Sequence, residues 1–258
     1  SLSSDGKTIA VGANGYKKAT GYVKVFKLVN NNWKLLGSAL YGPAEGSNWG
    51  SSVSLSGDGN FLAVSTNYTG NGGELRTYRL INNDWTQIGS KFTAPANDDL
   101  NVTKLSQDGK TIAISYYNFR DTTANYFRVF EINNGNWSKT FETKTNVHSS
   151  RAFDISPDGK TITFDKITFV GKKANGQDSF STDLRVYKKD QQNWKLIRQN
   201  FKKISWPTSL SLSEDGSILA ISGGYHSTNG HWSMGSRVYK VCPSEYYERR
   251  SVCDFLTN

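Results

Sequence analysis

The sequence repeats one short motif five times. A segment that reads apolar-Ser-x-Asp-Gly recurs at intervals of 50 to 57 residues, and a β-rich apolar run follows each copy. Asp-Gly between two such runs is typical of a tight hairpin, because glycine accepts the positive φ that hairpin turns require. Each copy therefore predicts a pair of antiparallel strands. The five copies contain Asp5, Asp58, Asp108, Asp158 and Asp215.

A second pair of strands is expected in each repeat. After a variable loop comes a triplet of a basic, a β-branched and an aromatic residue, as in Lys24-Val25-Phe26. In four repeats a polar turn then ends in tryptophan: Trp33, Trp85, Trp137 and Trp194. A four-stranded unit cannot bury both faces alone, whereas units packed radially around an axis cover one another. The sequence therefore predicts an all-β fold, a five-bladed β-propeller of four-stranded antiparallel blades.

We expect a single domain over residues 1–258, with repeats at approximately 1–50, 51–100, 101–150, 151–207 and 208–258. A β-solenoid has shorter coils, and a sandwich would not repeat the same strand chemistry five times. The fifth repeat lacks the tryptophan turn and contains Cys242 and Cys253 instead. We expect these cysteines to form a disulfide that ties a last strand, at residues 251–256, to the strand before it.

Two segments resemble known propeller repeats. The stretch from Asn48-Trp49-Gly50 to Asp58-Gly59 resembles the FG-GAP-type repeats of extracellular propellers. The stretch Ile155-Ser156-Pro157-Asp158-Gly159-Lys160 is similar to repeats of bacterial and WD-like propellers. The resemblance covers the whole chain, blade by blade, and implies the fold. FG-GAP blades of the integrin type carry a calcium loop with several carboxylates, and each turn here keeps only one. We therefore expect no metal and no cofactor.

The cysteines and glycosylation motifs favour an extracellular or cell-surface location. A disulfide implies an oxidising compartment, and Asn67, Asn101 and Asn136 begin Asn-x-Ser/Thr motifs. The first residues show neither a charged nor an apolar leader, so we take the start as processed or trimmed. No segment approaches the roughly 20 apolar residues of a membrane span.

The net charge of +9 favours anionic partners, although basic residues spread evenly over the solvent face would give the same charge. Basic runs do not exceed two or three residues, so nucleic acid is not expected as a partner. We expect a protein or an anionic glycan to bind, and higher-order assembly is compatible with this prediction.

Ligands of propellers usually bind where the loops after the second and fourth strands converge. Aromatic residues there suit sugar stacking or protein contact, and the alternative is that they cap the apolar blade ends. The candidates are Trp49, Tyr68, Tyr116, Tyr117, Trp206, Tyr225, His226 and Trp232.

The regular motifs, by contrast, are expected to be structural. Each turn aspartate should cap its own backbone, and each repeated tryptophan should pack between blades. The basic residue of the third strand should lay its stem on an aromatic ring and pair with a carboxylate or carbonyls. A ring of these residues that binds an anion is the alternative.

No catalytic set is apparent in the sequence. A five-bladed glycosidase needs two or three carboxylates near the axis, and among the equivalent first-strand positions only Asp154 is acidic. The histidines show no metal-ligand spacing. We therefore predict that the chain is not an enzyme but a secreted adhesion, scaffold or surface-assembly module. The alternatives are a carbohydrate-binding, lectin-like propeller and, third, a five-bladed glycoside hydrolase.

Overall fold

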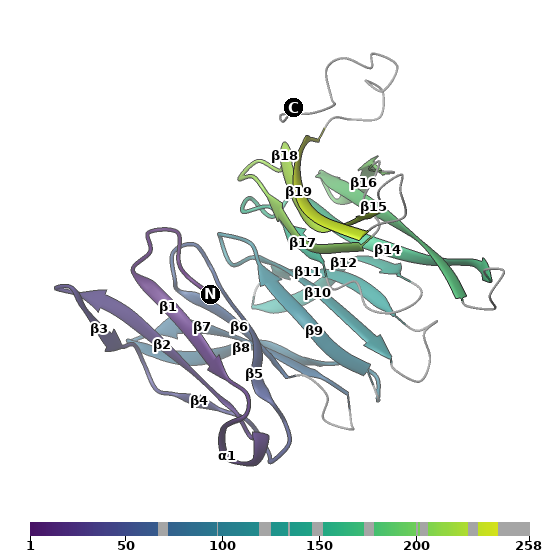
Figure 1. Cartoon of the computed structure of the whole chain (residues 1–258). Coiled ribbons are helices and arrows are strands. Elements are labelled where there is room, and N and C mark those ends of the chain that lie inside the picture. The colour runs from purple at the N-terminus through teal and green to yellow at the C-terminus, as the bar shows by residue number, and fades with distance from the viewer. Residues whose placement is uncertain are drawn as a thin grey trace. The chain divides into compact units, whose positions relative to one another are not determined.

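The computed structural model describes residues 1–66, 72–96, 98–118, 125–133, 135–145, 152–172, 178–199, 201, 206–226 and 232–241. The chain divides into two compact units, Ser1–Glu142 and Thr143–Asn258. The described residues form five antiparallel sheets in which strands that follow one another in the chain lie side by side (Figure 1). This arrangement confirms the all-β prediction. The single domain over residues 1–258 and the closed ring of five blades stay predictions.

The first two sheets belong to the first unit. The first sheet has the order β1 (Thr8–Ala13), β2 (Tyr22–Val29) and β3 (Asn32–Leu35), and β4 (Leu40–Tyr41) also pairs with β2. Before β1, pairing is limited to a bridge between Leu2 and Ile9. The second sheet is a complete meander of β5 (Trp49–Leu55), β6 (Phe61–Thr66), β7 (Glu74–Ile81) and β8 (Asp84–Thr93).

The third sheet contains β9 (Asp98–Leu105), β10 (Thr111–Asn118), β11 (Tyr126–Asn133) and β12 (Asn136–Lys144). In the second unit, the fourth sheet contains β13 (Phe153–Ile155), β14 (Thr161–Lys172), β15 (Asp178–Asp190) and β16 (Asn193–Arg198). The fifth sheet contains β17 (Trp206–Leu212), β18 (Ile218–His226) and β19 (Trp232–Lys240). The predicted strand at 251–256, Cys242 and Cys253 lie outside the described residues.

One short helix, α1 (Tyr16–Ala19), occurs in the described part of the chain, in the loop between β1 and β2. The sequence shows no helical period there, and residues with left-handed φ interrupt the turn. Nothing helical within the described ranges is long and apolar enough to cross a membrane.

The five Asp-Gly turns share one hydrogen-bond pattern. In the second sheet, the Ser56 hydroxyl donates to Asp58 Oδ1 at 2.6 Å, and the same Oδ1 accepts the Asn60 amide at 2.9 Å. The Phe61 amide donates to Ser56 Oγ at 2.9 Å. The same three bonds occur in the other four turns. The prediction that the aspartate caps its own backbone is confirmed.

Two of the repeated tryptophans join neighbouring sheets of the first unit. The Trp85 indole N–H donates to the Leu36 carbonyl at 2.9 Å, and that of Trp137 donates to Thr77 Oγ1 at 2.8 Å. The predicted packing between sheets is confirmed at these two positions. Trp33 differs, because 47% of its surface is exposed.

A second link joins the first strands of successive sheets. The Leu105 amide donates to Ser54 Oγ at 2.9 Å, and in the second unit the Leu212 amide donates to Asp154 Oδ2 at 2.7 Å. These acceptors occupy the same repeat position. Asp154, the acidic residue considered for catalysis, therefore anchors a neighbouring strand.

Candidate ligand-binding site

A cavity of about 260 Å³ opens between the loop before β5 and the second sheet. Its wall comes from the loop before β5, the end of β6, the start of β7 and the end of β8, which is the edge where the sequence predicts ligand binding. We call it the Glu74 cavity. The residues that matter for its chemistry are Glu45, Ser47, Thr66, Glu74, Lys91 and Thr93.

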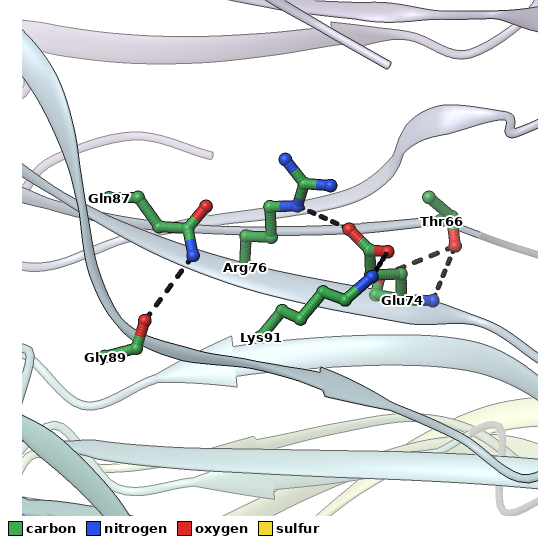
Figure 2. Close-up of polar contacts among 6 residues, drawn as sticks. All are labelled: Thr66, Glu74, Arg76, Gln87, Gly89 and Lys91. Carbon is green, nitrogen blue, oxygen red and sulfur yellow. Dashed lines mark hydrogen bonds and ion pairs between the residues drawn. The ribbon is translucent and has the colours of Figure 1, made fainter. Parts of the chain in front are cut away.

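Glu74 lies at the start of β7, with 12% of its side chain exposed. One carboxylate oxygen accepts a hydrogen bond from Nε–H of Arg76, and the other accepts one from Nζ of Lys91 at 2.9 Å (Figure 2). The Glu74 amide donates to Thr66 Oγ1 at 2.7 Å, which ties β7 to the end of β6. Burial alone would raise the pKa of Glu74, but the hydrogen bonds from Lys91 and Arg76 outweigh burial and hold the pKa below its ordinary value. The carboxylate is therefore ionised at neutral pH and acts only as an acceptor.

Arg76 reaches Glu74 because residues two apart on a strand share one face. The basic residue of the third strand pairs with a carboxylate in two further sheets, as Arg128 with Glu142 and as Arg185 with Asp183 at 2.7 Å. These three positions confirm the predicted ion pairing. They also argue against the anion-binding ring at these positions, because each guanidinium already faces a carboxylate.

β8 is irregular next to Lys91. Opposite Leu75 and Thr77, the register of β8 jumps from Phe92 to Ile88. Gly89 lies inside this bulge with φ +64°, a conformation that glycine adopts without steric cost. This two-residue shift pairs Glu74 with Thr93 and puts Lys91 diagonally across from Glu74 instead of directly opposite it. Nζ of Lys91 still reaches the carboxylate, and 54% of the Lys91 side chain is exposed.

Lys91 has no basic counterpart in the other repeats that contain the tryptophan. The residues at the same distance after those tryptophans are Ala39, Thr143 and Asn200. An ammonium has three N–H donors, and within the described residues Lys91 uses one of them on Glu74. The Glu74–Lys91 pair is therefore specific to the second repeat, unlike the repeated arginine pairs.

Hydroxyl groups complete the polar wall. The Ser47 hydroxyl donates to the Thr20 carbonyl at 2.8 Å, which fixes the loop before β5. Thr66 and Thr93 line the side of the second sheet. Glu45 is exposed and forms an ion pair of 3.2 Å with Lys18. The cavity therefore offers a carboxylate, an ammonium and hydroxyls, a set of groups that matches a polyhydroxylated ligand.

The lowered pKa of Glu74 does not suit a general acid. The acid of a glycosidase has a raised pKa, whereas the pKa of Glu74 is lowered. No group of three or more His, Cys, Asp or Glu side chains suited to a metal occurs among the described residues. The arrangement at Glu74 favours recognition of a ligand through hydrogen bonds.

Two of the predicted ligand-binding aromatics are buried. Trp49 has no exposed surface, lies edge-to-face with Tyr78 at 6.5 Å, and has the Arg76 guanidinium 5.5 Å from its ring. Tyr116 is also buried, and its ring stacks on Tyr126 at 5.5 Å. Burial raises the pKa of Tyr116 above its ordinary value. For both residues the structure favours the alternative role, which is to cap the blade ends.

The other predicted positions stay predictions. Tyr117 lies in β10, Trp206 in β17, Tyr225 and His226 in β18, and Trp232 in β19, while Tyr68 lies outside the described residues. Among the glycosylation motifs, Asn136 is exposed at the start of β12, Asn101 lies in β9, and Asn67 is outside the described residues.

The sequence reasoning missed Glu74 and Lys91. One signal could have found them: both depart from the repeat. The residue two before the strand-three basic residue is acidic only in the second and fourth repeats, as Glu74 and Asp183. Six residues after the tryptophan, the second repeat has the basic residue Lys91, and the other three repeats that contain the tryptophan have no basic residue there.

Comparison with known proteins gives a fold and no family. No family model and no curated protein sequence matches the chain. TolB from Acinetobacter baumannii is a similar solved structure, with 15% identity, a TM-score of 0.50 and coverage of 95% of this chain and 53% of that one. This chain thus spans about half the length of TolB.

Two lactonases are also similar in fold. The periplasmic gluconolactonase of Pseudomonas aeruginosa is 15% identical, with a TM-score of 0.41 and coverage of 90% of this chain and 82% of that one. A Bacteroides uniformis protein assigned as a 6-phosphogluconolactonase is 17% identical, with a TM-score of 0.42 and coverage of 92% and 79%.

These neighbours correct the functional prediction. The sequence predicted a non-enzymatic adhesion, scaffold or surface-assembly module, and that prediction is contradicted because structures of similar fold include enzymes. At this level of identity the likeness is one of fold and carries no reaction to this chain. The FG-GAP assignment and the count of five blades stay predictions. The chain is an all-β protein with several four-stranded antiparallel sheets, and its structural neighbours are propeller-like.

Proposed function

We propose that this chain binds a small carbohydrate, an acidic sugar in particular, in the Glu74 cavity. The observation that carries the proposal is the ionised Glu74 carboxylate, held at the cavity wall between Lys91 and Arg76. Each carboxylate oxygen has two acceptor sites, so sugar hydroxyls can donate to Glu74 while Lys91 donates to sugar oxygens.

The size and charge of the cavity narrow the ligand class. A volume of about 260 Å³ is just below the usual range of ligand pockets, which begins at about 300 Å³. This supports a single sugar unit rather than a long glycan. Arg76 and Lys91 carry two positive charges against one on Glu74, and Lys18 balances Glu45. The excess positive charge supports an acidic sugar such as a uronate or an aldonate.

The site is proposed once, in the second repeat, and not five times. Five equivalent lectin sites would require similar loops, and the loops of the five repeats differ in length and residues. Lys91 is the departure here, because the bulge at Gly89 has a counterpart in the first sheet, where β3 and β4 pair with β2 in registers two residues apart. A single site built on departures from the repeat agrees with this pattern.

Calorimetric titration with glucose, glucuronate and gluconate tests the proposal. We expect at least one acidic sugar to bind and Lys91→Met to weaken it by about 10-fold or more, since a hydrogen bond to a charged group contributes about 1.5–3 kcal/mol. Lys139→Met is the matched control, because Lys139 pairs with Glu142 at 3.1 Å outside this cavity. Absence of binding up to about 10 mM, or an equal loss in the control, would contradict the proposal.

Separate assays test whether the Glu74 cavity also catalyses hydrolysis of a bound sugar derivative. Base uptake in a pH-stat with glucono-lactone, and release of reducing sugar from glycosides, would reveal hydrolysis. Activity that is lost in Glu74→Gln and kept in Lys139→Met would extend the proposal from binding to catalysis. Asp154 is unsuited to this test, because its carboxylate holds the Leu212 amide and its loss would disturb the fold.

We also propose that the site operates outside the cytoplasm, in an extracellular or periplasmic setting. Support comes from the spacing of Cys242 and Cys253 and from the three glycosylation motifs. Mass spectrometry of the purified protein, with and without reductant, would test for the disulfide.

A further inference from the structure

A second cavity, of about 150 Å³, lies at the interface between the second and third sheets. Its apolar wall is formed by Leu75, Phe92, Ile112, Phe130 and Trp137. We call it the Phe92 cavity. It is distinct from the Glu74 cavity, although Lys91 lines both.

The equivalent interface lies between the first and second sheets. It is closed by contacts that differ at the interface between the second and third sheets. Between the first and second sheets, Asp84 Oδ1 accepts the Ser38 amide at 2.7 Å, and Trp85 is only 7% exposed. At the next interface Asn136 stands in the place of Asp84, and Trp137 is only partly buried. The space beside Trp137 therefore reflects packing that differs between these two interfaces.

The wall of the Phe92 cavity suits one aromatic ring. The Phe92 and Phe130 rings are 5.6 Å apart and tilted by 58°, and Trp137 adds an indole. Aromatic groups pack favourably in tilted and edge-to-face contacts with such rings. An apolar cavity of about 150 Å³ in another protein stays dry and takes up benzene, so the volume fits a ring of that size.

The polar residues at the edge of the Phe92 cavity favour a negatively charged ligand. Lys91 lines this cavity too, but its ammonium is bonded to Glu74 on the other face of β8, so the Lys91 side chain would turn from Glu74 to reach a ligand here. Glu74 would keep its bond to Arg76, which leaves one positive charge in excess. Ser90 and Asn136 lie at the edge of the cavity too and can form hydrogen bonds to a polar group. We propose that the Phe92 cavity binds a small aromatic carboxylate, with its ring against Phe92, Phe130 and Trp137 and its carboxylate at Lys91. This proposal does not depend on sugar binding in the Glu74 cavity.

Titration of the full chain with benzoate tests the proposal, followed by calorimetry and by tryptophan fluorescence. We expect saturable binding, and we expect benzamide, which has the same shape without the charge, to bind about 10-fold more weakly, a difference of about 1.4 kcal/mol. Lys91→Met should remove the preference for benzoate over benzamide. No saturable binding of benzoate up to about 10 mM, or equal affinity for both compounds, would overturn the proposal.

A matched pair of surface variants locates the ligand. Ser90→Leu places an apolar side chain at the rim and should weaken benzoate by about 10-fold or more. Ser38→Leu, at the same repeat position in the first interface, should leave the affinity unchanged. Both serines are exposed, so both variants should fold. Benzoate affinity that Ser90→Leu leaves intact would overturn the assignment.

Thr93→Val separates this proposal from the proposed function. Thr93 lines the Glu74 cavity but not the Phe92 cavity. We expect this variant to weaken sugar binding and to leave benzoate binding unchanged. Loss of benzoate binding in Thr93→Val would overturn the placement of the aromatic acid, whatever the result with sugars.

Discussion

Tryptophans at equivalent repeat positions experience different surroundings. Trp85 is 7% exposed and donates to the Leu36 carbonyl, whereas Trp33 is 47% exposed. We expect Trp85→Ala to lower the free energy of unfolding by about 3–5 kcal/mol, as for other buried aromatics. Trp33→Ala should change it by about 0.5 kcal/mol, typical of surface positions. Urea unfolding of both variants measures the difference, and equal losses would contradict the assigned packing.

Asp165 is a buried carboxyl at a position where other repeats have small residues. The counterparts are Gly12, Ser65, Ser115 and Ser222. Burial raises the pKa of Asp165 to about 8, and its Oδ1 has no hydrogen-bond partner within the described residues. The carboxyl is therefore protonated in the folded protein at neutral pH.

This raised pKa gives a pH dependence with a definite sign. Between pH 3.8, the ordinary pKa, and about 8, the folded state keeps the Asp165 proton that the unfolded chain loses. The contribution to stability is thus full below about pH 4 and falls as pH rises, by at most about 1.4 kcal/mol per pH unit. Asp165→Asn cannot ionise, so it should gain stability relative to the wild type between pH 5 and pH 8. Thermal unfolding at both pH values tests this, and a constant difference would contradict it.

At the level of elements, the Asp-Gly turns fit against the preceding sheet. A Cβ on Gly109 would lie 2.6 Å from the Phe61 ring, whereas a Cβ on Gly6 would meet nothing within 4 Å. Both glycines have φ +68°. Gly6→Ala should therefore cost only the strain of a left-handed residue, about 1–2 kcal/mol.

Gly109→Ala adds a steric clash to that strain. Overpacking typically costs a further 1–3 kcal/mol or so, and Gly109→Ala should be the more destabilised variant by about that amount. Urea midpoints of the two variants, compared with the wild type, give the measurement. If both alanines cost the same, Phe61 does not pack against this turn.

The turns and most strands could be predicted because their signals are local. Ser-x-Asp-Gly specifies its own hydrogen bonds within a few residues, so all five turns follow from the sequence. The burial of Trp49 could not be predicted, because it depends on contacts with Tyr78 and Arg76 of another strand. Aromatic residues in loops look alike in a sequence whether they cap a core or face solvent.

The strand pairing beside the Glu74 cavity contains an irregularity that is hard to predict from the sequence. If the register at Thr77 and Ile88 continued, Lys91 would be directly opposite Glu74, but the bulge around Gly89 shifts β8 by two residues and pairs Glu74 with Thr93. Glycine four residues after the tryptophan, as in Gly37 and Gly89, is the available signal. It indicates an irregular strand, but not which side chains meet.

Over the whole molecule, repeated positions provide packing and the departures from them carry the proposed chemistry. Asp-Gly turns, strand-three arginines and first-strand acceptors recur from sheet to sheet. Lys91 departs from the repeat, and it lines both proposed cavities. In repeat proteins each unit contacts mainly its neighbours, so a local departure can create a site without disturbing distant sheets.

The central claim is that an acidic sugar binds at Glu74, and amide chemical shifts across the whole chain test it most directly. A ¹⁵N-labelled sample titrated with glucuronate or gluconate should show saturable shifts at Ser47, Thr66, Glu74 and Thr93. Lys91→Met should move the midpoint of these shifts to about 10-fold higher ligand concentration or beyond, and Lys139→Met should leave the midpoint unchanged. Shifts confined to other sheets, or none up to about 10 mM ligand, would contradict the account.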